Sequence, residues 1–205
     1  MLQGLCFCAL LPTPRLETRT RVALFIHRIE DRKPTNTGRL AVECLANSEV
    51  IVRGFRSAPT PAFVPHRGSI PVLLFPGTDA IPLTELVGAR SPVTLVVPDG
   101  SWRQAFKVRQ RVPGLSDLPC VSLPRETDSR YQLRRESNDV GLATMEAIAR
   151  ALGILEGPEV RAELERVFLT MVERTLVSRG TLGVSKLETP LPPFFQANDF
   201  RSRRC

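Results

Sequence analysis

The sequence is poor in histidine, tryptophan and tyrosine, with two, one and one of these residues among 205. Because His27 and His66 are the only imidazoles, a Ser-His-Asp or Cys-His mechanism has almost no candidate base. The single Trp and single Tyr also argue against binding of single-stranded nucleic acid on a platform of stacked rings.

Several motifs with known chemistry are missing as well. The sequence has no Gly-Lys-Ser/Thr phosphate loop, no Gly-x-Gly-x-x-Gly, no His-Glu-x-x-His and no Gly-x-Ser-x-Gly. Nucleotide hydrolysis, nicotinamide redox chemistry and serine hydrolysis are therefore unfavourable interpretations. There is also no apolar run of about 18 residues and no basic segment before a cleavage site at the start. We expect a cytoplasmic protein without membrane association.

The five cysteines, an odd number, do not describe a disulfide framework in a chain of this size, and we interpret them as thiols. Cys6 and Cys8 could supply two zinc thiolates, but a tetrahedral structural site needs four ligands. Cys44 and Cys120 fall in apolar segments and are expected in the core.

The overall composition fits a globular domain with a polyanionic partner. Apolar residues make up 42% and charged residues 24%, as in ordinary soluble domains. Lys and Arg number 28 against 21 Asp and Glu, which gives a net charge of +7 and favours a partner such as nucleic acid. Between residues 101 and 135, eight basic and three acidic residues concentrate this excess.

Short apolar runs alternate with helical patterns along the chain. Strands are expected at residues 22–26, 49–55, 71–76, 92–98 and 119–123, and helices from about 37 to 48, from 101 to 112, from 144 to 155 and from 159 to 178, with at most a short helix at 83–87. This order predicts an α/β fold with a mainly parallel sheet and helices on both faces. Ligands of such sheets bind beyond the carboxyl ends of the strands, where His27, Gly54, Pro76 and Asp99 fall.

The segment VTLVVPDGSWRQAFK is the most informative. Asp99 ends a buried strand, and Gly100 and Ser101 turn the chain into an amphipathic helix. We expect Trp102, Ala105, Phe106 and Arg109 on one side of this helix and Arg103, Lys107 and Arg111 on the other. Asp99 could simply cap the helix, with Trp102 as a core anchor, or it could face a ligand. Asn36 and Thr37 form a second turn of this kind.

These segments, taken in order, resemble one known family. HRIE, NTGRLA, LANSEVIVRG, VLLFPG, VTLVVPDGSWRQAFK, LPCVSL, YQLRRE and LATMEAIARAL are similar to the DTW-domain family of tRNA-uridine aminocarboxypropyltransferases, related to SPOUT-type enzymes. The similarity covers about residues 6 to 155. The family core, usually written DGTW, reads Asp99-Gly100-Ser101-Trp102 here, and serine keeps the hydroxyl. The family's HPxE element is His27-Arg28-Ile29-Glu30.

The resemblance implies a reaction and a SPOUT-like fold. The reaction transfers the 3-amino-3-carboxypropyl group of S-adenosylmethionine to N3 of a tRNA uridine and releases methylthioadenosine. Whether the chain is knotted stays open, because no local pattern reports a knot. The expected division is an N-terminal extension at 1–20, the remnant of a Cys-rich segment, a catalytic domain at 21–180 and a tail at 181–205. Cys6 and Cys8 would then be an incomplete zinc site, since relatives commonly carry a further Cys pair upstream.

The resemblance also implies roles for individual residues. Asp99 would be catalytic, either as the base for uridine N3 or as the anchor of the donor's amine, and Thr144 would cap a helix that closes the site. Cofactor contacts are expected at Thr37, Phe75, Pro76, Asp99, Gly100, Ser101, Trp102, Leu123 and Thr144. RNA contacts are expected at Arg39, Arg103, Lys107, Arg125 and Arg134. The expected partners are tRNA and S-adenosylmethionine, with no obligate protein partner.

Two alternatives remain open from the sequence. A SPOUT-type RNA methyltransferase would use the same cofactor in another orientation, because whichever electrophilic carbon of the sulfonium faces the nucleophile reacts. A non-catalytic RNA-binding module would also account for the basic segment.

Overall fold

The computed structural model describes residues 5–55, 57, 59–124, 129, 141–189 and 191, and only the backbone of Trp102. Six strands form one sheet, β1 (Arg21–His27), β2 (Ser48–Arg53), β3 (Ile70–Leu74), β4 (Ile81–Pro82), β5 (Val93–Pro98) and β6 (Cys120–Ser122). The helices are α1 (Arg28–Asp31), α2 (Thr37–Cys44), α3 (Trp102–Arg111), α4 (Thr144–Leu155) and α5 (Pro158–Ser178), with 3-10 turns η2 (Cys8–Leu10), η3 (Leu83–Leu86) and η4 (Val184–Lys186).

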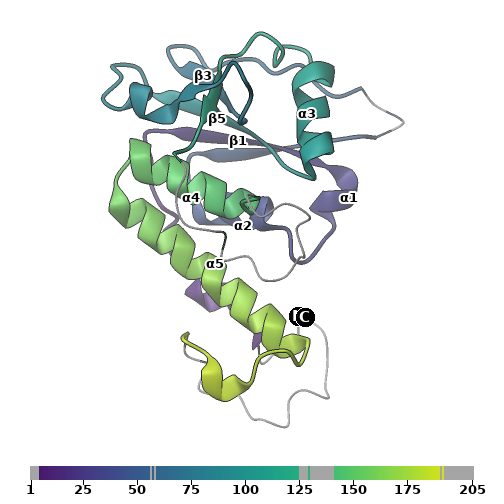
Figure 1. The fold of residues 1–205 in the computed structure, drawn as a ribbon, viewed down its shortest axis with the longest axis vertical. Helices are drawn as coiled ribbons and strands as arrows, with labels where there is room; N and C mark the ends of the chain where they lie inside the picture. The colour runs from purple at the N-terminus through teal and green to yellow at the C-terminus, as the bar shows by residue number, and fades with distance from the viewer. Residues whose placement is uncertain are drawn as a thin grey trace.

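The sheet is parallel throughout, in the order β2-β1-β5-β3-β6-β4. Helices cover both of its faces, α2, α4 and α5 on one and α3 on the other (Figure 1). The predicted α/β fold is confirmed. Alternation along the strands explains the layers, since Leu24 packs toward α2 and α4 while Phe25 packs toward α3.

The topology reverses direction between β1 and β5, which makes this the candidate ligand site. These strands are neighbours, with Phe25 beside Pro98. The chain after β1 passes through α2 to β2 on one side, whereas the chain after β5 passes through α3 to β6 on the other. Such a switch point leaves a crevice beyond the carboxyl ends of the two strands. Residues His27 and Asp99 lie there, as predicted.

Helix α2 ends at Cys44, four residues before the predicted end at Ser48. The Ser48 hydroxyl donates to the carbonyls of Val42 at 3.1 Å and Leu45 at 2.8 Å, and the amide of Leu16 donates to the carbonyl of Cys44 at 2.8 Å. The last carbonyls of α2 thus receive hydrogen bonds from donors outside the helix, so the helix can end at Cys44. No local sequence pattern signals this long-range pairing.

The predicted faces of α3 were partly wrong. Phe106 is 48% exposed, whereas Ala105, Val108 and Val112 are buried against the sheet. Successive residues of a helix are separated by about 100°, so a face centred on Val108 turns Phe106 outward. The predicted exposure of Arg103 is confirmed.

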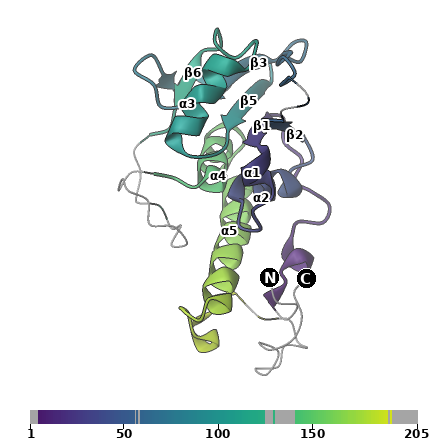
Figure 2. The same ribbon diagram turned by 90° about the vertical axis from the view of Figure 1, so that its right-hand side faces the viewer.

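Two short elements escaped prediction, α1 and β4. Helix α1 has four residues, too few to show a period. Helix α5 has 21 residues and extends beyond the sheet (Figure 2). Within the described part of the chain, no helix has both the length and the apolar character needed to cross a membrane.

Candidate active site

Asp99 lies at the end of β5 with its carboxylate held from two other elements. It is only 4% exposed, and its amide donates to the carbonyl of Phe25 at 2.8 Å. Nδ2 of Asn36 donates to Oδ2 of Asp99 at 2.7 Å, and the Thr144 hydroxyl donates to Oδ1. Segments far apart in sequence therefore converge on one carboxylate.

The start of α2 is built around this carboxylate. Oδ1 of Asn36 accepts from the amide of Arg39 at 2.7 Å, so Asn36 rather than Thr37 caps α2, while its amide group binds Asp99. The buried Thr37 accepts from the amide of Met145 at 3.4 Å. A Cβ atom on Gly38 would lie 3.2 Å from Oδ1 of Asp99, so the helix backbone passes close to the acid.

Asp99 does not cap α3, and the simpler interpretation of this residue was wrong. Ser101 is the N-cap of α3, and Oε1 of Gln104 accepts from the Ser101 amide at 2.8 Å and from its hydroxyl at 3.0 Å. Gly100 makes the turn with a φ of 132°, a region that favours glycine. The polar groups of this turn are hydrogen-bonded within the turn itself. The Asp99 side chain is therefore directed to the face of the sheet opposite α3, toward α2 and α4.

Thr144 does not cap α4, contrary to prediction. The N-cap is Ala143, and its amide donates to Oε2 of Glu146 at 2.9 Å. Because the Glu146 side chain does the capping, the Thr144 hydroxyl is directed to Asp99.

The carboxyl ends of β1 and β2 are held together beside the site. Nδ1 of His27 accepts from the amide of Ile29 at 3.3 Å, and Nε of Arg28 donates to the carbonyl of Gly54 at 2.9 Å. Gly54 has a φ of 88°, and a Cβ there would lie 2.3 Å from the His27 ring. Burial, followed by the charges of Arg53 and Arg28, lowers the pKa of His27 despite the opposing charge of Glu30.

Arg53, which is not among the predicted site residues, also lies at this edge. One Nη donates to the carbonyl of Gln104 at 3.3 Å, whereas the buried Nε has no hydrogen-bond partner among the described residues. Burial and then the charge of Arg111 lower the pKa of Arg53, and the charge of Asp99 opposes them. Its only sequence signal is its place at the end of a strand.

The loop after β3 is fixed to α3. Phe75, half-buried, lies 6.3 Å from Phe106 between ring centroids at an interplanar angle of 43°. Arg109 donates to both carboxylate oxygens of Asp79 at 3.3 and 2.6 Å, and this hydrogen bonding lowers the pKa of Asp79. Pro76 is exposed in the loop, and Leu123 packs against the core on the α4 side.

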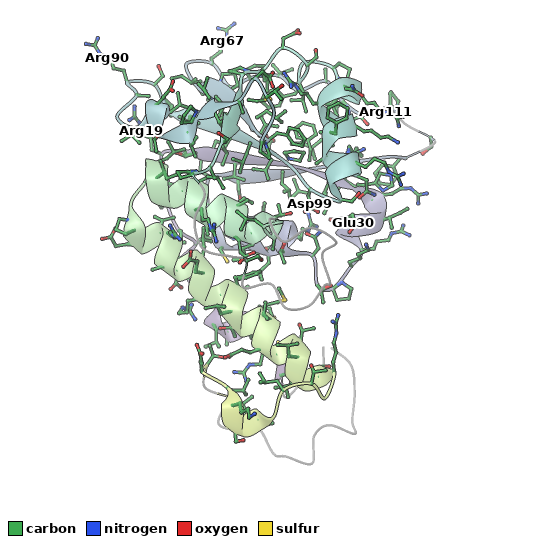
Figure 3. All side chains as sticks on the ribbon, viewed as in Figure 1. Arg19, Glu30, Arg67, Arg90, Asp99 and Arg111 are labelled. Atoms are coloured by element: carbon green, nitrogen blue, oxygen red, sulfur yellow. The ribbon has the colours of Figure 1, made fainter. Side chains whose placement is uncertain are left out.

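The predicted RNA-binding residues are distributed unevenly. Arg103 is exposed and Lys107 half-exposed on α3, while the exposed Arg39 lies 3.6 Å from Asp31 in an ion pair. Arg125 and Arg134 lie outside the described residues. Figure 3 shows Arg111, Asp99 and Glu30 at one end of the strands, and Arg19 and Arg90 at the other.

Cys6 and Cys8 are close neighbours, with sulfurs 3.2 Å apart. Within the described ranges, no group of three or more His, Cys, Asp or Glu side chains is arranged to hold a metal ion. Cys44 and Cys120 are buried, as expected of core residues.

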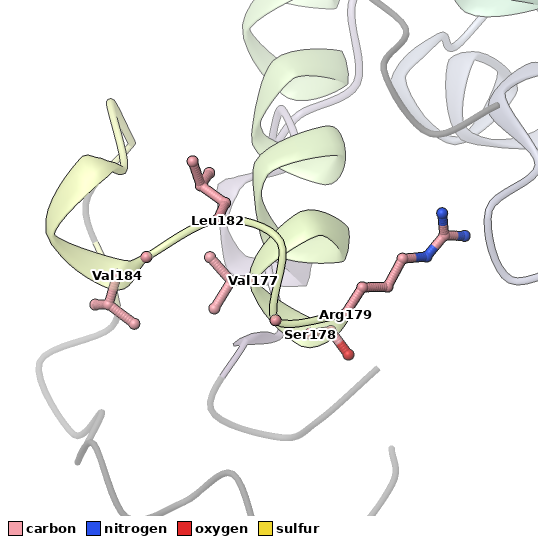
Figure 4. Close-up of a pocket in the computed structure, with 7 residues that line it drawn as sticks. Val177, Ser178, Arg179, Leu182 and Val184 are labelled. Atoms are coloured by element: carbon pink, nitrogen blue, oxygen red, sulfur yellow. The ribbon is translucent and has the colours of Figure 1, made fainter. Parts of the chain in front are cut away.

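One pocket among the described residues lies away from this site. A volume of about 530 Å³ at the carboxyl end of α5 is lined by Val177, Ser178, Arg179, Gly180, Leu182, Gly183 and Val184 (Figure 4). It contains none of the predicted site residues. The candidate site is therefore placed at Asp99, where polar side chains converge, because the volume of a pocket does not by itself indicate a binding or catalytic function.

Comparisons with known proteins agree on one family. The DTW domain model matches residues 1–176. The chain is 28% identical to tRNA-uridine aminocarboxypropyltransferase 2 of Drosophila melanogaster, over 83% of this chain and 70% of that protein. It is 31% identical to the Mus musculus protein of the same name, over 75% and 54%, and 26% identical to tRNA-uridine aminocarboxypropyltransferase A of Arabidopsis thaliana, over 82% and 76%. The chain thus spans about half the length of the mouse relative. No solved structure gives a significant match.

Proposed function

Since the chain belongs to the DTW domain family, we propose that it transfers the 3-amino-3-carboxypropyl group of S-adenosylmethionine to N3 of a uridine in tRNA. The relatives named above are tRNA-uridine aminocarboxypropyltransferases. The observation that carries the proposal is the buried carboxylate of Asp99, held by Asn36 and Thr144 at the switch point of a parallel sheet.

The groups at this edge fit an amino-acid donor. The donor carries an ammonium and a carboxylate, which need an anion and a cation in the protein. Asp99 supplies the anion, and each of its oxygens has a second lone pair beyond the one that accepts from Asn36 or Thr144. Arg53 supplies the cation, and its buried Nε lacks an acceptor among the described residues. Phe75, which directly follows β3 at the same edge of the sheet, offers an apolar surface.

The reaction needs little from the protein besides orientation and removal of one proton. The donor supplies an activated carbon on a sulfonium; a bond from uridine N3 to this carbon forms, the carbon–sulfur bond breaks with its electron pair kept by sulfur, and methylthioadenosine leaves. The proton of N3 must go to a base. Asp99 takes this proton or holds the donor's ammonium, and its position suits either role.

The other residues of the cluster orient Asp99 and bound molecules. Asn36 and Thr144 fix the two carboxylate oxygens. Thr37 and the Phe75-Pro76 turn contact the donor, as do the backbone at Gly100 and Ser101 and the side chains of Trp102 and Leu123. Arg103 and Lys107 hold phosphates, as do Arg39, Arg125 and Arg134.

Product analysis tests the proposal directly. Protein incubated with total tRNA and S-adenosylmethionine should yield aminocarboxypropyl-uridine and an equal amount of methylthioadenosine, measured by mass spectrometry of nucleosides. Methylated uridine would identify a methyltransferase instead, and the absence of any modified nucleoside would contradict both enzymes.

A substitution pair then tests Asp99. Asp99→Ala should lower the rate by about 10²- to 10⁴-fold, the usual contribution of a general acid or base. Asp117→Ala is the matched control, because Asp117 is an exposed aspartate just before β6, at the amino end of the strands. A folded Asp99→Ala variant with the wild-type rate would remove this residue from the mechanism.

A further inference from the structure

Phe106 is a large apolar side chain that the core leaves half exposed. It is 48% exposed on α3, while Ala105, Val108 and Val112 of the same segment fill the core. Its ring lies beside Phe75, which follows the carboxyl end of β3. Strand β3 is the neighbour of β5, so the Phe75 ring lies at the same carboxyl edge of the sheet as Asp99, on the face that α3 covers.

The surroundings of Phe106 are basic. Helix α3 reads WRQAFKVRQR, with four basic and no acidic residues. Arg109 is paired with Asp79 and so fixes the loop that carries Phe75. Arg103 and Lys107 lie three residues before and one residue after Phe106, and both are accessible. An exposed ring flanked by cations is complementary to nucleic acid, in which flat bases alternate with phosphates.

The chemistry of uridine N3 requires such a surface. N3 lies on the Watson–Crick edge, which a paired base does not expose. The reacting uridine must therefore be unpaired and turned out of its stack, with its edge toward the donor. Unstacking costs free energy, and proteins offset it by stacking a side chain on a freed base.

We propose that Phe106, supported by Phe75, stacks on an unpaired base of the tRNA at the modified position, between phosphates held by Arg103 and Lys107. The inference rests on the proposed function for the identity of its RNA. The proposal needs only one ring for one base, not a platform of several rings. It is therefore compatible with the scarcity of Trp and Tyr in the chain.

The test measures tRNA affinity, which does not depend on turnover. Wild type, Phe106→Ala, Phe106→Leu and Phe106→Tyr are compared by filter binding with labelled total tRNA at several salt concentrations. Phe106→Ala should bind about 5- to 150-fold more weakly, the range for loss of one base stack. Phe106→Tyr should bind as wild type does, and Phe106→Leu should resemble Phe106→Ala, because an aliphatic chain has no π face.

Salt dependence separates stacking from charge. The slope of log affinity against log salt should be the same for Phe106→Ala and wild type, because no phosphate contact is lost. Val87→Ala is the control for loss of an exposed apolar side chain, since Val87 is 57% exposed and lies two residues from Ala89 at the amino end of the strands. The Val87→Ala variant should bind tRNA as wild type does.

Several results would overturn the inference. These are unchanged affinity in Phe106→Ala, full affinity in Phe106→Leu, or loss of affinity in Phe106→Tyr when its thermal unfolding midpoint equals that of wild type. The proposed function is judged separately by nucleoside analysis of the wild type. A wild type that forms no product, together with the expected affinities, would reject the reaction and retain the base contact.

Discussion

Asn36 binds Asp99 and caps α2 with the same side chain. Its Nδ2 donates to Oδ2 of Asp99 at 2.7 Å, and its Oδ1 accepts from the amide of Arg39 at 2.7 Å. These partners also fix the orientation of the Asn36 amide group, because its nitrogen faces an acceptor, the Asp99 carboxylate, and its oxygen faces a donor, the Arg39 amide. The stability of α2 and the orientation of the acid are therefore coupled.

Two substitutions separate these roles of Asn36. Asn36→Ala should lower the free energy of unfolding by about 0.5–2 kcal/mol through loss of the cap, and should also lower the rate of transfer. Asn36→Ser keeps a capping oxygen but is too short to reach Asp99, so its stability should stay near wild type while the rate falls about 10- to 100-fold. Urea unfolding and single-turnover rates measure the two effects. A wild-type rate in Asn36→Ser would show that this hydrogen bond does not orient the acid.

Gly38→Ala should be destabilising although alanine favours helices. The new Cβ would lie 3.0 Å from Cδ1 of Leu24, 3.1 Å from Cγ2 of Thr144 and 3.2 Å from Oδ1 of Asp99. Leu24 is fully buried and Asp99 is hydrogen-bonded, so neither yields easily. The cost of overpacking should exceed the gain in helix propensity. The free energy of unfolding, measured with urea, should therefore fall by about 1 kcal/mol. A variant more stable than wild type would show that these neighbours can move.

Charge reversal on α3 should weaken tRNA binding and flatten its salt dependence. Arg103→Glu combined with Lys107→Glu removes two phosphate contacts, so the slope of log affinity against log salt should fall by about one to two. Donor affinity, measured by calorimetry, should be unchanged. Arg67→Glu combined with Arg90→Glu is the control, because both residues lie away from Asp99 in Figure 3. Equal effects of the two pairs would indicate a general charge effect.

Acid should destabilise the start of α1 through His27. Its Nδ1 must be unprotonated to accept from Ile29, and its pKa lies below the usual 6.5 because of burial and the charges of Arg53 and Arg28. For a histidine whose pKa is lowered by folding, the stabilisation is present above about pH 6.5 and is lost as pH falls through the lower folded value. His27→Asn keeps a capping acceptor that does not titrate.

The drop in thermal unfolding midpoint from about pH 7.5 to about pH 5 should therefore be smaller in His27→Asn than in wild type. Their difference isolates His27 from the other groups that titrate in this range. Equal drops in the two proteins would mean that His27 has no part in the acid sensitivity.

The described thiols should differ in reactivity. Burial is the largest of the effects that raise the pKa of Cys44 to about 12, and burial also raises the pKa of Cys120. At pH 8 only about one Cys44 in 10⁴ is then a thiolate, the reactive form. Iodoacetamide labelling followed by peptide mass spectrometry should modify the exposed Cys8 well before Cys44 or Cys120. Early labelling of Cys44 in native protein would contradict its burial.

Much of the architecture could be read from local pattern. The strands ending near His27 and Asp99 are short apolar runs, and helical periods follow the polar turns at Asn36 and Ser101. Because parallel strands share one carboxyl edge, these patterns also placed Asp99 at the ligand side of the sheet. The family resemblance rested on the same segments.

Contacts between distant segments decided the rest. No local signal joins Asn36 and Thr144 to Asp99, 63 and 45 residues away, and none turns Phe106 outward or brings Arg53 beside α3. The sequence by itself determined the longer strands and helices, their order along the chain and the edge that holds the acid, because hydrophobic period is a local property. Only the tertiary structure decided which side chains share a hydrogen bond and which faces stay exposed, because these depend on how the helices pack across the sheet.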